Sequence, residues 1–285
     1  MSQKLAVAIL HGAGTPEADF AEEMMRLITK DFTKKLHLDN AEQELVFEPV
    51  FWSVVFADEQ AALWKQVQEN ANLHYDRLRR FTIEFLGDAI AYQPTVSGDQ
   101  NYDKVHAIFA ESLSRLKNRA GSTAPLCVIS HSLGSIVASN YFADLQFRQE
   151  KIGMRTKQRM NNTPLEKGET LSLFYTMGSP LALWSVRYVD FGSPIHVPSP
   201  LLKQYHANVQ GEWLNFYDKD DVLAYPLKSI NEMYETNVTK DVAVNVGGMF
   251  TSWNPLSHSR YNEDDDVITP IVDGLVKTWK KVNEQ

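Results

Sequence analysis

The sequence predicts an α/β protein with one mostly parallel sheet of about six strands and helices on both of its faces. Short, mostly apolar runs, of which residues 5–10 are apolar at every position, alternate along the chain with longer runs in which apolar residues recur at helical spacing. A strand that is apolar at every position is buried on both faces, which is typical of parallel sheets. Hydrophobic residues make up 44% of the 285 positions, which is ample for a large core. We expect residues 1–285 to form a single domain.

The expected strands are the short apolar runs, taken in chain order. They lie near residues 4–10, 45–51, 125–130, 170–177, 212–217 and 241–246. The segments between them are expected to supply the helices, and a last helix is expected at the C-terminus. No internal repeat or low-complexity linker interrupts this alternation.

Two insertions are expected in this pattern, at about residues 52–94 and 178–211. The first carries apolar residues at helical spacing and predicts one or two packing helices. These residues are Trp64, Val67, Ala71, Leu78, Phe81 and Phe85. A third segment, residues 148–167, is polar and locally basic, and we expect a mobile, solvated loop there. A docking patch for an anionic substrate or surface is the alternative for that segment.

The third expected strand turns directly into a helix at a serine. Residues 129–135 read Ile-Ser-His-Ser-Leu-Gly-Ser, so that small residues, Ser130 and Gly134, stand two places on either side of Ser132. A serine at a sharp strand-to-helix corner with small neighbours is the pattern of a nucleophile elbow. Ser130 occupies the position where the usual motif has glycine. The pattern predicts Ser132 as a nucleophile.

The first expected strand ends in a loop that contains two glycines. Residues 11–16 read His-Gly-Ala-Gly-Thr-Pro, and Thr15 before Pro16 predicts the start of a helix. A dinucleotide-binding loop would need glycine at Glu17, and no Gly-Lys-Ser/Thr follows, so we reject a nucleotide site. No His-Glu-x-x-His motif or cysteine cluster is present, and the single Cys127 is expected in the core. We therefore expect neither a metal nor a cofactor.

With a His-Gly loop after the first strand and a serine at a later strand-to-helix corner, the chain resembles the α/β-hydrolase fold, specifically its lipase- and esterase-like members. The resemblance extends from about Lys4 to the C-terminal helix. It implies that the backbone amides of Ala13 and Leu133 form an oxyanion hole. We further expect His11 and Gly12 of the loop, and His131 beside the serine, to contact the substrate.

The resemblance also implies an acid after the fifth strand. Residues 218–221 read Asp-Lys-Asp-Asp. Asp221 fits best, because the family often places its acid a few residues past this strand and just before an apolar residue. Asp218 is the second candidate and Asp220 a weaker third. The preceding strand ends in Gly-Ser-Pro at residues 178–180 and offers no carboxylate.

The base implied by the resemblance is His258. It is the only one of the eight histidines that lies in a loop after the last expected strand. His196 and His206 precede the acid, which is the wrong order for the family. The histidines on expected helices are taken as surface or packing residues: His37, His74 and His106.

The order Ser132, Asp221, His258 predicts a serine hydrolase that forms an acyl-enzyme on a carboxylic ester or related acyl compound. The same triad would serve an acyltransferase, a thioesterase or an amidase. A protein that kept the fold without the activity would instead be a binding protein. Because the family often inserts cap or pocket-wall elements near residues 178–211, we expect Trp184 at the substrate.

The net charge and the N-terminal sequence limit the kinds of partner and the cellular location that we expect. The formal net charge of −8 disfavours nucleic acid as a partner. The N-terminal apolar run is too short to span a bilayer and is not followed by a signal-peptide cleavage pattern. We expect a cytoplasmic protein without a transmembrane segment, whose partner is a small-molecule acyl substrate.

Overall fold

The computed structural model describes residues 2–70, 73–94, 100–187, 193–246, 258 and 260–284. Its centre is a six-stranded sheet with the strand order β2-β1-β3-β4-β5-β6, in which every neighbouring pair is parallel. The strands are β1 (Leu5–Leu10), β2 (Leu45–Val50), β3 (Leu126–His131), β4 (Leu171–Met177), β5 (Glu212–Asp218) and β6 (Lys240–Val244). The predicted fold class is confirmed, and each predicted strand agrees with an observed one to within two residues at either end.

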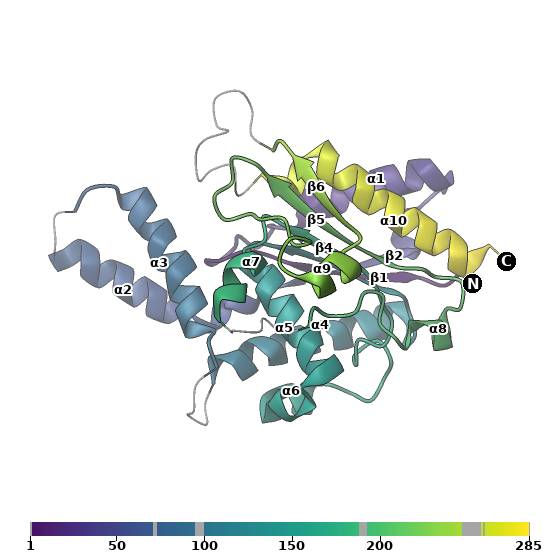
Figure 1. Cartoon of the computed structure of the whole chain (residues 1–285), viewed down its shortest axis with the longest axis horizontal. Coiled ribbons are helices and arrows are strands. Elements are labelled where there is room, and N and C mark those ends of the chain that lie inside the picture. The colour runs from purple at the N-terminus through teal and green to yellow at the C-terminus, as the bar shows by residue number, and fades with distance from the viewer. Residues whose placement is uncertain are drawn as a thin grey trace.

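Helices cover both faces of the sheet (Figure 1). One layer contains α1 (Glu22–Leu36) and α10 (Asp265–Asn283), and the other contains α4 (Asn101–Ala120) and α5 (Leu133–Phe147). The remaining helices are α2 (Ala57–Asn70), α3 (Asp76–Ala91), α6 (Met154–Arg159), α7 (Leu181–Trp184), α8 (Leu202–Tyr205) and α9 (Glu232–Asn237). No helix within the described ranges is both long and apolar enough to cross a bilayer.

Each strand contributes to two hydrophobic cores, one on each face. In β1, Ala6, Ala8 and Leu10 pack toward α4 and α5. Leu5, Val7 and Ile9 pack toward α1 and α10. Successive side chains of a strand point to opposite faces. The continuous apolar runs in the sequence therefore reflect burial on both faces of the sheet.

The first helix begins later than Thr15 and Pro16 predict. It starts at Glu22, and residues 18–21 form turns in which Phe20 N–H donates to the Glu17 carbonyl. The ring of Phe20 packs edge-on against both His11 and Phe51. These contacts hold the segment against the loop after β1, so the chain enters its helix only beyond Phe20.

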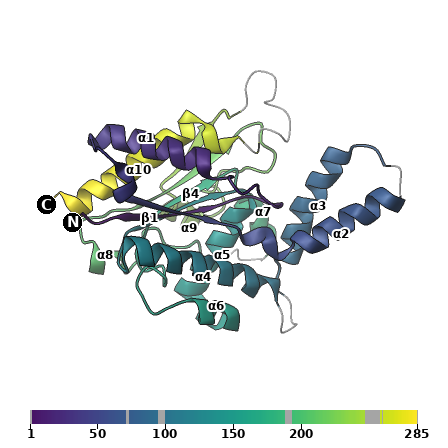
Figure 2. The same ribbon diagram turned by 180° about the vertical axis from the view of Figure 1, so that it is seen from behind.

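The insertion at residues 52–94 forms a short 3-10 helix (Trp52–Val55) followed by α2 and α3. The two helices lie side by side and project from the body of the protein (Figures 1 and 2). Of the residues expected to pack, Phe85 is buried, Leu78 is exposed, and Ala71 lies outside the described residues. The helical spacing thus predicted the helices correctly, but this pair buries less than a core helix does.

Residues 148–167 are not the mobile loop that their polarity predicts. They contain a 3-10 helix (Gln149–Lys151) and α6, which packs on α4. The carboxylate of Asp103 in α4 accepts hydrogen bonds from the N–H groups of Arg155 and Thr156 in the first turn of α6. A carboxylate at this position satisfies N–H groups that have no partner within their own helix. The cap comes from a residue about fifty positions away, so the local composition could not reveal it.

Candidate active site

Ser132 forms the corner between β3 and α5. Its backbone has φ 49° and ψ −126°, a conformation that is unfavourable for a residue with a side chain. The Ser132 N–H donates to the Met177 carbonyl at the end of β4, at 2.8 Å. A Cβ atom at Gly134 would collide with the His11 carbonyl oxygen, which explains why this position is small. Neighbouring strands and the first loop therefore hold the strained corner in place.

Ser130 replaces the usual glycine of the elbow without disturbing it. Its side chain is fully buried, and its Oγ donates to the Tyr175 carbonyl at 3.2 Å. The hydroxyl thus has a partner on the neighbouring strand β4, and burying it leaves no unpaired donor.

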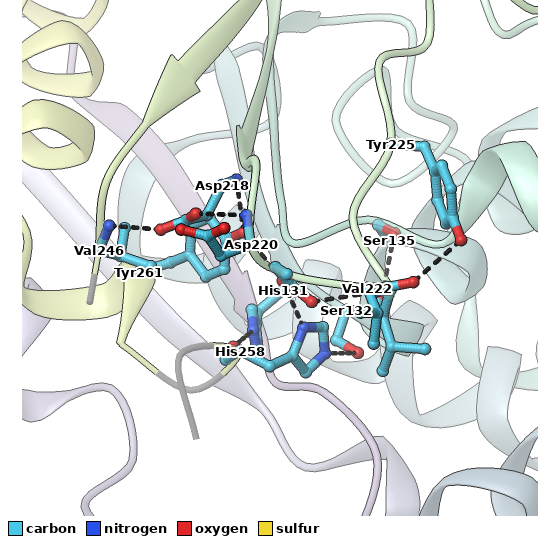
Figure 3. Close-up of polar contacts among 12 residues, drawn as sticks. His131, Ser132, Ser135, Asp218, Asp220, Val222, Tyr225, Val246, His258 and Tyr261 are labelled. Carbon is cyan, nitrogen blue, oxygen red and sulfur yellow. Dashed lines mark hydrogen bonds and ion pairs between the residues drawn. The ribbon is translucent and has the colours of Figure 1, made fainter. Parts of the chain in front are cut away.

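His258 links the serine to an aspartate (Figure 3). Its Nε2 lies 2.6 Å from Ser132 Oγ, and its Nδ1 lies 2.7 Å from Asp221 Oδ2. All three side chains are buried. An ionised carboxylate can only accept, so the Nδ1 proton is donated to Asp221, and Nε2 is left to accept from the serine hydroxyl. This is the tautomer that a histidine needs to take a proton from Ser132.

The three candidate aspartates have different partners. Asp221 faces His258 and also accepts from the Leu223 N–H at 3.0 Å. Asp218 accepts from the N–H groups of Asp220 and Val246, and so ties the end of β5 to the chain after β6 (Figure 3). The side chain of Asp220 is exposed. Only Asp221 lies within hydrogen-bond distance of His258.

The pKa of Asp221 lies below its usual value. Burial acts to raise this pKa, but it is outweighed by the hydrogen bond and charge interaction with His258 together with the bonds from Leu223 and Tyr261. Asp221 is therefore held as a carboxylate that can stabilise a positively charged imidazole.

Tyr261 supports the aspartate and was not singled out from the sequence. Its hydroxyl donates to Asp221 Oδ2 at 2.9 Å and accepts from the Asp218 N–H at 2.9 Å. The side chain is fully buried, and burial raises the pKa of Tyr261, so the hydroxyl keeps its proton and remains a donor. A tyrosine three residues after the candidate histidine is a sequence signal that could have indicated this role.

His131 supports the backbone of the histidine loop. Its Nε2 lies 2.5 Å from the His258 carbonyl oxygen, and its ring packs against the rings of His258 and Tyr261. Burial, followed by the nearby His258, lowers the pKa of His131 to about 3, so this ring is neutral near physiological pH. Contact of His131 with a substrate stays a prediction.

The loop after β1 lies directly against the serine. A Cβ atom at Gly12 would be 3.0 Å from Ser132 Cβ, so only glycine allows this approach without a shift. Ala13 is the next residue of the loop. Leu133 is the first residue of α5, so its N–H has no acceptor within the helix. The two amides expected to form the oxyanion hole thus belong to segments that meet at Ser132.

Side chains from the first insertion hold this loop. Trp52 Nε1 donates to the His11 carbonyl at 2.9 Å, and Ser53 Oγ donates to the Gly14 carbonyl at 2.7 Å. The Gly14 N–H donates to Asp88 Oδ2 at 2.8 Å. None of these three residues was recognised from the sequence, because the contacts join residues about 40 to 75 positions apart.

His11 packs within the loop. Its ring stacks on Trp52 with ring centroids 5.1 Å apart, and its Nδ1 lies 2.7 Å from the Gly12 carbonyl. Burial lowers the pKa of His11 to about 3. Its Nε2 is buried and has no hydrogen-bond partner among the described residues. A neutral ring with one free nitrogen could accept a hydrogen bond from a ligand.

The other predicted site residue, Trp184, is not brought into hydrogen-bond contact with Ser132 or His258 in the described structure. It ends α7, packs partly buried against the core that contains Leu133, and has an unpartnered, buried indole N–H. Its role at the substrate stays a prediction.

The three histidines that were expected on helices have the following positions in the structure. His106 is buried against the Tyr92 hydroxyl, and His37 follows the last residue of α1. His74 lies between α2 and α3, not on a helix as expected. Within the described ranges, no group of three or more histidine, cysteine or acidic side chains could hold a metal ion.

Comparison with known proteins identifies no family for this chain. No family model matches the sequence, and no curated protein matches it significantly. Among solved structures, the chain is similar to the esterase domain of a Rhodothermus marinus protein at 11% identity, with a TM-score of 0.32 over 92% of this chain and 85% of that one. A TM-score this low does not indicate an activity, so the function proposed below rests on the geometry of the site.

Proposed function

We propose that this protein is a serine hydrolase of the α/β-hydrolase family that cleaves a carboxylic ester or related acyl compound through an acyl-enzyme. One observation carries the proposal. Ser132 stands at a strained corner with its hydroxyl 2.6 Å from His258 Nε2, while the other nitrogen of the same ring is 2.7 Å from Asp221. A nucleophile bonded to a base that is itself oriented by an acid is the arrangement that activates a serine.

In the first half of the proposed reaction, Ser132 Oγ attacks the acyl carbon and its proton passes to His258 Nε2. The carbonyl oxygen becomes negative and accepts hydrogen bonds from the N–H groups of Ala13 and Leu133. The imidazolium then gives its proton to the leaving alkoxide as the bond from carbon to that oxygen breaks. The acyl group is left as an ester on Ser132.

In the second half, His258 takes a proton from water, and the resulting hydroxide attacks the acyl-enzyme. Collapse of the second tetrahedral intermediate returns the proton to Ser132 and releases the carboxylic acid. Asp221 keeps the Nδ1 proton in place and stabilises the imidazolium in both halves. Tyr261 and Leu223, through their bonds to Asp221, fix the direction of that carboxylate.

The test is labelling with a fluorophosphonate, followed by intact-mass measurement and peptide mapping. We expect one adduct, on Ser132, and none in Ser132→Ala. Ser130→Ala is the matched control, because that serine is two positions away but its hydroxyl is bonded to the Tyr175 carbonyl and not to a base. It should label like the wild type. An adduct on Ser130 or Ser135 would mean that the proposed nucleophile is wrong.

The same protein should be assayed with a p-nitrophenyl ester, the matching thioester and the matching anilide. Fastest turnover of the ester, lost in Ser132→Ala, supports the proposed class. If labelling succeeds but added alcohols or amines accept the acyl group in preference to water, the protein is an acyltransferase. If the wild type neither labels nor turns over any of the three, it is a binding protein.

A further inference from the structure

A second carboxylate, Asp88, belongs to the site without touching the serine or the histidine. It lies near the end of α3 and its side chain has no exposed surface. One oxygen accepts the Gly14 N–H at 2.8 Å. The other oxygen accepts from Gln60 Nε2 of the neighbouring helix α2. Both oxygens of this buried acid are therefore paired, and one of the pairs is a backbone amide of the loop against Ser132.

The loop is held at the peptide that follows Ala13. Gly14 has φ +86°, a conformation that glycine adopts readily and residues with a side chain rarely adopt. Its N–H is fixed by Asp88, and its carbonyl is fixed by Ser53 Oγ. Asp88 therefore holds the peptide between Ala13 and Gly14, and Ser53 holds the peptide that follows Gly14. The Ala13 N–H, the proposed oxyanion donor, lies in the preceding peptide, whose Gly12 carbonyl is 2.7 Å from His11 Nδ1, so its direction is restricted from both sides.

Holding an amide with Asp88 lowers the stability of the folded protein, because burial of a carboxylate destabilises its charged form. Burial, opposed by the bonds from Gly14 and Gln60, raises the pKa of Asp88 to about 7. An asparagine would accept the same bond without the charge. A charged acceptor, however, binds an N–H group about twice as strongly as a neutral one.

We propose that Asp88 is a positioning residue for the oxyanion loop, through which the α2–α3 pair controls the Ala13 amide beside Ser132. The inference rests on the proposed function, since it concerns the donor to the developing oxyanion. It assigns to the projecting helices a role that the sequence did not indicate: Asp88 of α3 bonds to Gly14 of the loop, and Gln60 of α2 bonds to Asp88.

The groups around Asp88 allow its protonation to be observed at the Gly14 amide. The groups that face it are the Gly14 N–H from the loop, Gln60 from α2, and Glu84 from its own helix, whose carboxylate pairs with Arg80. His11, at the start of the loop, has a pKa of about 3 and is neutral near pH 7. A change in the Gly14 amide near pH 7 would therefore report Asp88.

The first test observes that amide directly. Alanine labelled with ¹³C at the carbonyl and glycine labelled with ¹⁵N select Ala–Gly peptide bonds, of which the chain has two, at 13–14 and 120–121. We expect the Gly14 signal of the full-length protein to shift with pH around a midpoint of about 7, and to stop shifting in Asp88→Asn. Gly121, which donates to the Lys117 carbonyl, is the internal reference and should stay constant. A Gly14 signal that titrates equally in both proteins would overturn the inference.

The second test is kinetic. Asp88→Ala should lower the acylation rate with a p-nitrophenyl ester by roughly 10- to 100-fold with little change in KM, as expected when an oxyanion donor is misplaced. Asp88→Asn keeps an acceptor for Gly14, so its acylation rate should stay within about threefold of the wild type. An unchanged kcat in Asp88→Ala would overturn the inference.

Asp144→Asn is the matched control. Asp144 is also a buried carboxylate, but it is bonded to the Tyr102 hydroxyl and paired with Arg148, away from the loop. Any general loss of stability should appear here too, while kcat and its pH profile stay unchanged. If Asp88→Ala does not fold, Asp88→Asn decides through the Gly14 signal: a shift with a midpoint near pH 7 that persists in this variant refutes the inference.

The two proposals fail in different ways. If the wild type shows no Ser132-dependent labelling or turnover, the proposed function fails, and the positioning role falls with it even where Gly14 still titrates. If the wild type is active and loses activity in Ser132→Ala, but neither Asp88 variant differs from it, the function stands and only the positioning role is wrong.

Discussion

The end of the sheet and the insertion at residues 52–94 hold the two parts of this site by different means. Ser132 and Asp221 follow the carboxyl ends of β3 and β5, and backbone hydrogen bonds between strands fix where those ends lie. The loop after β1 is instead fixed by three side chains from outside the sheet: Trp52, Ser53 and Asp88. The position of the proposed nucleophile therefore depends on the register of the sheet, whereas that of the proposed oxyanion donor depends on an insertion.

This difference leads to graded predictions. Substitutions of Ser132, His258 or Asp221 should nearly abolish the chemistry and leave the fold intact. Substitutions in the supporting contacts should weaken the chemistry, or change the stability, by smaller amounts.

The largest effect is expected at the nucleophile and the base. Ser132→Ala and His258→Ala should each lower kcat for an ester by roughly 10⁴- to 10⁶-fold, because either change removes the activated serine. The double variant should be no worse than the single ones, since the two residues act as a unit. Steady-state kinetics of the three proteins would check this. A double variant much slower than either single variant would argue that the residues act separately.

The next effect separates the aspartates. Asp221→Asn should lower kcat by roughly 10⁴-fold, because the histidine loses the partner that sets its tautomer and stabilises its charge. Asp220→Asn should cost little, since that side chain is exposed. Asp218→Asn should lower thermal stability more than kcat, because its carboxylate ties the end of β5 to Val246. A collapse of turnover in Asp218→Asn, with Asp221→Asn near wild type, would refute the assignment of the acid.

A smaller effect is expected at Tyr261. Tyr261→Phe removes the hydroxyl that joins Asp221 to the Asp218 N–H, while the ring can still pack against His131. A hydrogen bond to a charged group is worth about 1.5–3 kcal/mol, so we expect a roughly 10- to 100-fold loss in kcat/KM. The matched control is Tyr225→Phe, whose hydroxyl is bonded only to the Val222 carbonyl at the surface. Equal losses of kcat/KM in the two variants would contradict the role of Tyr261 as a support for Asp221.

The strands and the spacing of the proposed triad were predictable because they depend on local patterns. A strand buried on both faces is mostly apolar: β1 is apolar at every position, and β4 at all but Ser172 and Thr176. The elbow needs small residues at positions 130 and 134. The supports were not predictable, because each is a contact between distant segments. Gly14 meets Asp88 across 74 positions, and α6 is capped by Asp103 across 52. Nothing in the local sequence of Asp88 distinguishes it from the other acidic residues on the exposed faces of helices.

The last expected effect is on stability rather than on turnover, and it tests whether the burial of Asp88 destabilises the folded protein. Its pKa in the folded protein, about 7, is above the value of 3.8 that applies when the chain is unfolded. Between these values the folded state binds more protons than the unfolded state, so this group lowers the stability of the wild type as pH rises from about 4 to 7. Asparagine does not titrate. The free energy of unfolding of Asp88→Asn, measured by urea denaturation, should therefore gain on the wild type across that range and then level off above it. A difference between the two proteins that is the same at pH 4 and pH 8 would show that burial does not raise the pKa of Asp88 in the folded protein.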